Sequence, residues 1–148
     1  MAGIGISIDI EGIEQLNVIF ERLSSINATP VMTVLGRLLE EQTVSRIKDE
    51  KSAPNGGAWP QWSPRYEAKR HSNQSLLENE GHLVDSIQSV EGRDSIEVGT
   101  NLVYARRHQY GDPKKNIPQR QFLGVSSGNS YELQKTLEDW FYSHTTGM

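Results

Sequence analysis

Cysteine is absent from the 148-residue sequence, and aromatic residues make up only 7% of it. Without thiols, the chain can form no disulfide and no thiolate metal or redox site, and a reducing cytoplasm is an adequate compartment for it. No apolar run approaches the roughly 20 residues that a membrane-spanning helix needs, so we expect no membrane contact. Glycine is common, yet no glycine-rich loop is followed by Lys and Ser/Thr, which excludes a phosphate-binding loop of that type.

No residues have the spacing of a catalytic or metal site either. The histidines are scattered and lack the spacing of a zinc site: His71, His82, His108 and His144. His82 and Asp85 could in principle pair for acid–base chemistry, but such a pair is far more often an ordinary surface pair. The stretch from Gly124 to Ser126 lacks the strand-to-helix setting of a nucleophile elbow. We therefore expect a protein that is not an enzyme and that uses no metal and no cofactor.

Charge is unevenly distributed along a chain whose net charge is −4. Residues 76–99 contain six acidic residues and one basic residue, whereas residues 103–121 contain five basic residues and one acidic residue. Neighbouring blocks of opposite sign suit copies of one chain that meet head to tail in a ring. An ordinary solvated surface is the commoner cause of such a pattern, and this alternative stays open.

The hydrophobic periodicity predicts an α+β fold, with a small, mainly antiparallel sheet flanked by three main helices. Isoleucine alternates with small or polar residues over 4–10, which indicates a strand, and residues 87–99 indicate a β-hairpin. The expected elements, in one domain spanning 1–148, are a strand at 4–10, a helix at 13–24, a helix at 29–51, a short helix at 63–70, the hairpin at 87–99, a short helix through His108, a strand near 117–125 and a helix from 129 that frays over 143–148.

Two of the expected helices have clear starting residues. Thr29 and Pro30 suit the cap and the first position of a helix. Asn129 and Glu132 have the spacing of a capping box, with Asn129 as the cap. Beyond Leu39 the first of these helices is poor in apolar residues, so we expect its second half to lie in solvent or on a neighbouring subunit.

Residues 52–75 are predicted to form an extended loop with a short helix, because glycine and proline interrupt any regular pairing there. The loop carries Trp59 and Trp62. These side chains could cap the core from outside, or they could anchor a partner, since tryptophan is enriched at interface hot spots. Both interpretations are open at this point.

Residues 98–124 combine backbone constraint with positive charge more densely than any other stretch. Gly111 is placed to end the short helix in a left-handed conformation. The only acidic residue of the stretch is Asp112, and its five cationic residues are Arg106, Arg107, Lys114, Lys115 and Arg120. So much positive charge in an acidic chain indicates a surface that contacts another molecule.

Three strings, in this order, resemble the virion morphogenesis (tail completion) family of tailed phages, the Mu- and P2-like group. They are Gly57-Ala-Trp-Pro-Gln-Trp-Ser63, Gly81-His-Leu-Val-Asp-Ser-Ile87, and the stretch from Val98 to Gly124 with its Tyr-Ala-x-x-His-Gln-x-Gly and Ile-Pro-x-Arg-x-Phe-Leu-Gly patterns. The resemblance covers about 57–124, and beyond it only length and helix placement agree. It departs from the family at Gln119, where the family tends to have a small residue or Arg, and at Gln121, where it tends to have Pro.

The resemblance implies two kinds of residue. Those expected to form turns or to pack the base of the segment on the sheet are Gly81, Gly99, Tyr104, Ala105, Gly111, Ile117, Pro118, Phe122, Leu123 and Gly124. Those expected to contact another subunit or a partner are Trp59, Trp62, Arg106, Arg107, His108, Gln109, Lys114, Lys115 and Arg120. For His108, Gln109 and Arg120 the alternative is that they satisfy buried backbone groups, and Arg120 could otherwise bind a neighbour's carboxylate through two hydrogen bonds.

The function implied is structural. A protein of this family would complete or terminate the phage tail, or form part of the head–tail neck, as a ring of copies, with sixfold symmetry expected because such tails are sixfold. Its partners would be further copies of itself and the tail tube, head-closure or connector proteins. Nucleic acid is not an expected partner, apart from a possible contact with the genome that passes through the ring. It would be made in the host bacterial cytoplasm and be found in the virion.

The alternative from the residues is a small nucleic-acid-binding protein. The cations of 104–122 could follow a phosphate backbone while Tyr104, Tyr110 and Phe122 stack on bases. The overall acidity of the chain and the small size of the basic patch disfavour this interpretation.

Overall fold

The structure is a computed structural model that describes residues 4–9, 29–62, 64, 68, 76–77, 82–92 and 95–145. Several expected features lie wholly or largely outside the described residues: the helix at 13–24, the short helix at 63–70, Gly81 and the end of the tail at 146–148. From the short helix, one helical hydrogen bond is described, in which the Ala68 N–H donates to Pro64 O (3.2 Å).

The described strands form a three-stranded antiparallel sheet in the order β1-β3-β2. β1 is Ile4–Asp9, β2 is Gln88–Glu91 and β3 is Ser95–Thr100. The register places Ile6 opposite Val98, and on the other side of β3 it places Val90 opposite Glu97. The expected strand at 4–10 and hairpin at 87–99 are confirmed, because the alternation that marked them puts Ile4, Ile96 and Val98 into the core.

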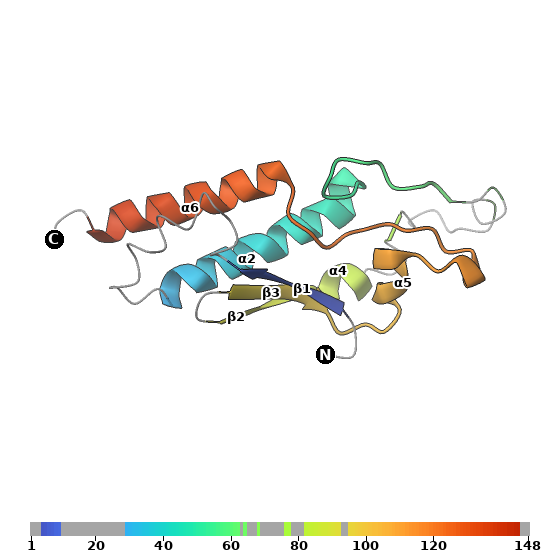
Figure 1. The fold of residues 1–148 in the computed structure, drawn as a ribbon, viewed down its shortest axis with the longest axis horizontal. Coiled ribbons are helices and arrows are strands. Elements are labelled where there is room, and N and C mark those ends of the chain that lie inside the picture. Colours follow the sequence, from blue (N-terminus) through green and yellow to red (C-terminus); the bar gives the residue numbers. More distant parts are fainter. Residues whose placement is uncertain are drawn as a thin grey trace.

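Two long helices lie side by side over one face of this sheet (Figure 1). α2 is Thr29–Ser45 and continues as a π-helical turn, η2, at Arg46–Glu50; α6 is Ser127–Thr145. α2 packs directly on β2 and β3, and α6 packs on α2. The fold is therefore α+β, as the sequence predicts.

The second half of α2 is not solvent-exposed, contrary to expectation. Gln42, Thr43, Arg46 and Ile47 are all buried. They carry few apolar groups, but α6 and the segment after Phe122 cover them, and most of their polar groups bond inside the molecule. Thr43 Oγ1 donates to Leu39 O at 2.8 Å and Gln42 Nε2 donates to Asn129 O at 3.2 Å, whereas Gln42 Oε1 is buried without a hydrogen-bond partner among the described residues. The sequence-based prediction took the polar face of this part of the helix to be exposed, whereas it is buried.

The expected strand near 117–125 is also wrong. Asp112 and Ile117 form one isolated bridge, and residues 118–125 run as an extended segment without a strand partner. Their backbone groups bind side chains instead of a neighbouring strand, as described below. Three short elements precede this segment: α4 at His82–Ser86, α5 at Ala105–Tyr110 and the 3-10 turn η3 at Pro113–Lys115.

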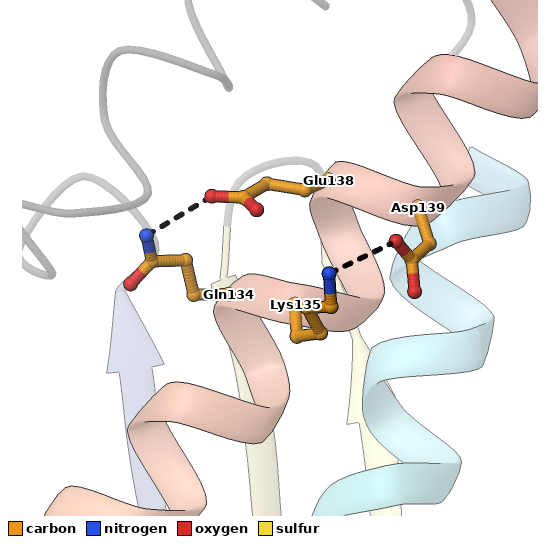
Figure 2. Close-up of polar contacts among 4 residues, drawn as sticks. All are labelled: Gln134, Lys135, Glu138 and Asp139. Atoms are coloured by element: carbon orange, nitrogen blue, oxygen red, sulfur yellow. Dashed lines mark hydrogen bonds and ion pairs between the residues drawn. The ribbon is translucent and has the colours of Figure 1, made fainter.

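α6 begins two residues before the expected cap. Ser126 Oγ accepts the Asn129 N–H (3.0 Å) and Asn129 Oδ1 accepts the Ser126 N–H (3.1 Å), so Ser126 is the cap of a reciprocal capping box and Asn129 its third-position partner. The helix extends through Thr145, beyond the predicted start of fraying at 143. Figure 2 shows two contacts between residues one turn apart on α6, Gln134 to Glu138 (3.0 Å) and Lys135 to Asp139 (3.8 Å).

Candidate protein-interaction surface

Residues 103–117 form a compact projection, called the basic knob here, at the end of the molecule opposite the C-terminal end of α6 (Figure 1). It consists of the turn at 103–104, α5 and η3. β3 leads directly into it, and the Thr100 side chain fixes the exit: its Oγ1 accepts the Leu102 N–H (3.1 Å) and lies 2.6 Å from Ser86 Oγ. Thr100 thus holds the loop before α5.

The backbone of the knob is closed into a tight loop. The Asp112 N–H donates to Ile117 O (2.8 Å) and the Ile117 N–H donates to Asp112 O (3.0 Å). Asn116 takes the left-handed conformation, with φ at 56°, which allows the chain to return after η3. Gly111 ends α5 with φ at 77° and ψ at 165°, so the positive φ is as predicted, but the ψ is extended and is not that of the left-handed helical conformation expected there. A Cβ at this position would lie 3.0 Å from Gln119 N. The charged side chains are therefore carried by an ordered scaffold.

Four cations of the knob are exposed: Arg106, Arg107, Lys114 and Lys115. Arg106 lies over the Tyr110 ring, 6.0 Å from its centroid, and Arg107 Nε is 3.8 Å from Asp112 Oδ2. For Lys114 and Lys115 no ion pair is formed with any of the described residues. The knob keeps a net positive surface after its internal contacts are counted.

Apolar side chains are exposed on the same knob. Val103 is 72% exposed and Tyr110 60%. Tyr104, which was expected to pack against the sheet, is 41% exposed, and its ring meets His108 edge-on at a centroid distance of 6.0 Å. That expectation is wrong, because Ala105 takes the buried position at the start of α5.

Gln109 holds the segment that follows the knob. Its side chain is buried between α5 and residues 122–123, where Oε1 accepts the N–H groups of Phe122 (3.1 Å) and Leu123 (3.0 Å) and Nε2 donates to Leu123 O (3.1 Å). These three bonds replace the pairing that a strand at this position would have made. Of the two roles considered for Gln109, the structure shows the binding of buried backbone groups.

His108 is partly buried beside two arginines. Burial, and then the charges of Arg120 and Arg107, lower the pKa of the His108 imidazole. Its Nδ1 is buried without a hydrogen-bond partner among the described residues, which suits the neutral ring. The side chain therefore belongs to the inner side of the knob, and its backbone oxygen accepts the Arg120 N–H (2.7 Å).

Arg120 and Trp59 act inside the subunit, so of the two roles considered for each residue the structure shows the internal one and not the contact with a partner. Arg120 is buried, and its Nε donates to Pro60 O at 2.8 Å. Trp59 is only 3% exposed, and its Nε1 donates to Gln121 O at 2.9 Å. Together they join the 52–62 loop to the extended segment. Trp62 is half-buried against the core.

The remaining motif residues are mostly structural, as expected. Phe122 and Leu123 are fully buried, and Ile117 and Pro118 are half-buried. A Cβ on Gly99 would lie 2.3 Å from Ile4 O, and one on Gly124 would lie 2.4 Å from Pro54 Cγ, so each glycine permits a close approach of two chain segments.

Sequence reasoning missed Arg46, which is among the largest fully buried side chains of the described residues. Its Nη1 donates to Phe122 O (2.9 Å) and Gly124 O (3.1 Å), and its Nη2 bonds Asn129 Oδ1. Burial lowers the pKa of the guanidinium, which Glu50 opposes, but an arginine stays charged in a protein. Nothing in the local pattern of a charged helical turn distinguishes it from a solvated arginine.

The described residues contain no group of three His, Asp or Glu side chains placed to hold a metal ion. No helix among them is long and apolar enough to cross a membrane. What the site offers chemically is charge, aromatic surface and an ordered backbone, which are means of recognition.

The sequence model of the phage virion morphogenesis family matches residues 10–142. The chain belongs to that family. It is also 26% identical to the Mu-like prophage FluMu G protein 2 of Haemophilus influenzae, over 143 residues that cover 92% of this chain and 96% of the relative. No solved structure matched. The protein therefore has a structural role in phage morphogenesis, associated with the virion.

Proposed function

We propose that the protein completes or terminates the phage tail, or forms part of the neck that joins head and tail, by assembling as a ring. The observation that carries the proposal is the family match over nearly the whole chain. The ring is joined by shape and charge complementarity, and no covalent bond is made or broken. On this proposal the protein is not an enzyme.

The surface of the basic knob supports assembly from identical copies. Its cations and exposed aromatic side chains face outward on a closed loop, while the chain as a whole is acidic. A surface of this kind can meet an acidic surface elsewhere on a second copy. Such head-to-tail contacts close into a ring when the rotation between copies divides a full turn.

The other partners follow from the position of such a ring. It would contact the tail tube on one side and head-closure or connector proteins on the other, within the tail or neck of the virion. We propose sixfold symmetry, which is the symmetry of tails of this class. Any contact with nucleic acid would come from the genome as it passes through the ring, and assembly would take place in the host bacterial cytoplasm.

The proposal is tested by native mass spectrometry and negative-stain electron microscopy of the purified protein, alone and mixed with tails that lack it. We expect closed rings in at least one of the two samples, and rings bound at one end of each tail. Monomers in both samples, with tails left undecorated, would contradict the proposal.

The second candidate is a nucleic-acid-binding protein, favoured by Arg106 stacked near Tyr110 and by the two exposed lysines of η3. It predicts DNA binding whose affinity falls steeply with salt, with a slope set by the number of phosphate contacts. Fluorescence anisotropy with a labelled duplex and a single strand measures this. An absence of binding at low salt eliminates the candidate.

A further inference from the structure

The basic knob and the turn end of the β2–β3 hairpin lie toward opposite ends of the sheet (Figure 1). The exposed charges of the knob are mostly positive and those of the hairpin are negative, and each of the two has exposed apolar side chains of its own. We infer that the knob of one copy docks on the β2–β3 hairpin of the next copy. This inference rests on the proposed ring and names the two surfaces that join it.

The knob supplies the cationic half of the contact. Val103 and Tyr110 are largely exposed, and no hydrogen bond to another described residue occupies the side chain of either. Arg106 lies over the Tyr110 ring, and Lys114 and Lys115 are exposed on the same knob. Exposed apolar side chains together with charged ones are the composition of a protein–protein contact.

The hairpin supplies the acidic half. Glu91 and Glu97 are exposed, and neither forms an ion pair with a described residue. Val90, directly opposite Glu97 in the register, is 58% exposed. Val90 and Glu97 thus lie together on the face away from α2, while Glu91, opposite Ile96 and bonded to Thr33, lies on the α2 side of the hairpin. The charges of the hairpin are opposite in sign to those of the knob.

The position of the hairpin also favours docking through side chains and not through an added strand. Glu40 of α2 blocks part of the β2 edge, since its Oε1 accepts both the Ser89 N–H (2.7 Å) and the Ser89 hydroxyl (2.9 Å). Thr33 on the same helix donates to Glu91 Oε1 (3.0 Å) and orients that carboxylate. The backbone N–H that a new strand would need at Ser89 is therefore occupied.

A second copy of this chain is favoured over other occupants because one chain carries both complementary surfaces. The surfaces are different patches, so the contact is head to tail and repeats around a ring. A contact with nucleic acid would leave the acidic hairpin without a role, and it would use the cations of the knob but not Val103.

The test exchanges charges between the surfaces. One variant carries Arg106→Glu and Lys115→Glu, and a second carries Glu91→Lys and Glu97→Lys. Each alone places like charges across every contact, so we expect its self-association constant, measured by analytical ultracentrifugation at low salt, to fall about tenfold or more. An equimolar mixture should restore assembly, because the two variants then alternate around the ring with opposite charges at each contact.

The matched control for the first variant is Lys48→Glu with Lys135→Glu, which makes the same change of charge at exposed positions on η2 and α6. It should assemble like the wild type, and circular dichroism melts should show all variants folded. Rings that form equally well from the first two variants overturn the inference but leave the proposed function standing. The inference is also overturned if the two variants fail to assemble when mixed, or if the control loses self-association as much as they do. Wild-type protein that never self-associates, alone or on tails, refutes the proposed function itself.

If the first variant loses DNA binding while its rings stay intact, the knob binds nucleic acid and the inference is wrong. If both variants are unfolded alone yet ordered when mixed, the contact is confirmed, since only docking can supply the missing order.

Discussion

At the scale of single residues, buried polar side chains hold together segments that have no regular secondary structure. Arg46, Gln109 and Trp59 all direct hydrogen bonds to backbone atoms between Gln121 and Gly124. Each bond adds only about 1 kcal/mol to stability, but a buried group left unpaired costs about 1–3 kcal/mol. The effect of these residues on stability is therefore largest when they are removed, because their backbone partners are then left unpaired.

Gln109→Ala should lower the free energy of unfolding by about 3 kcal/mol, because it leaves the buried N–H groups of Phe122 and Leu123 without partners and removes one of the two donors to Leu123 O. Urea titration followed by tryptophan fluorescence measures the change. The control is Gln119→Ala, whose exposed side chain makes one hydrogen bond, to Gln109 O; it should cost less than about 1 kcal/mol. Equal effects of the two substitutions would contradict the role given to Gln109.

His108 makes stability depend on pH in a stated direction. Its pKa is lowered in the folded protein, chiefly by burial, so the unfolded chain binds the proton more readily. The contribution of the neutral ring is therefore complete above pH about 6.5 and is lost as the pH falls toward the lowered folded pKa.

Unfolding free energies at about pH 8 and about pH 5.5 should differ more for the wild type than for His108→Gln, which cannot titrate near the unperturbed histidine pKa of about 6.5. The comparison between the two proteins removes the effect of every other titrating group. An identical pH dependence in both would show that the imidazole is protonated as easily in the fold as in the unfolded chain.

At the scale of elements, the 52–62 loop and the extended 118–125 segment depend on each other. Trp59 and Arg120 join them through hydrogen bonds, and Gly124 lets Pro54 approach closely. The π-helical turn η2 leads into this loop, and Lys51 ends it in a left-handed conformation with its N–H donated to Arg46 O (2.9 Å). The end of α2, the loop and the segment thus form one packed unit behind the knob.

Gly124→Ala should destabilise the protein by about 2 kcal/mol, since the new Cβ would overlap Pro54 Cγ and Gly124 has a positive φ. Adding Pro54→Gly should return about 1 kcal/mol, because it removes the overlap but not the backbone strain. Denaturant unfolding of both single variants and the double variant gives the coupling. Strictly additive effects would show that the two residues do not meet in solution.

At the scale of the whole molecule, the basic knob lies beyond one end of the sheet, and the turn end of the β2–β3 hairpin lies toward the other (Figure 1). The knob has exposed cations and the hairpin has the exposed Glu91 and Glu97. The salt-sensitive contacts that such surfaces make are screened within about 10 Å at 0.1 M ionic strength. Assembly should therefore respond to salt more strongly than folding does.

Raising the salt concentration from roughly 0.05 M to about 0.5 M should weaken self-association severalfold, through slower association. Sedimentation velocity across a salt series measures it, with thermal melts as the control for folding. Association that strengthens with salt would indicate a contact dominated by apolar burial.

The sequence predicted the sheet well because apolar residues alternate with small or polar ones along β1 and over Ile96–Val98 of β3, where Ile96 and Val98 are buried. It predicted the turn at Gly111 because few residues adopt positive φ. It failed at residues 118–125, where an extended backbone does not reveal whether its partner is a strand or a side chain. It also misplaced Trp59 and Arg120, since exposure of a loop residue depends on what folds over it.

The sequence by itself determined the α+β class, the turn at Gly111 and the location of the basic block, because periodicity, backbone preference and charge are local properties. Only the tertiary structure decided which polar residues are buried. Arg46 and Gln109 became internal partners of the 122–124 backbone because residues far apart in the chain close over them, whereas Arg106 and Lys115 were left at the surface.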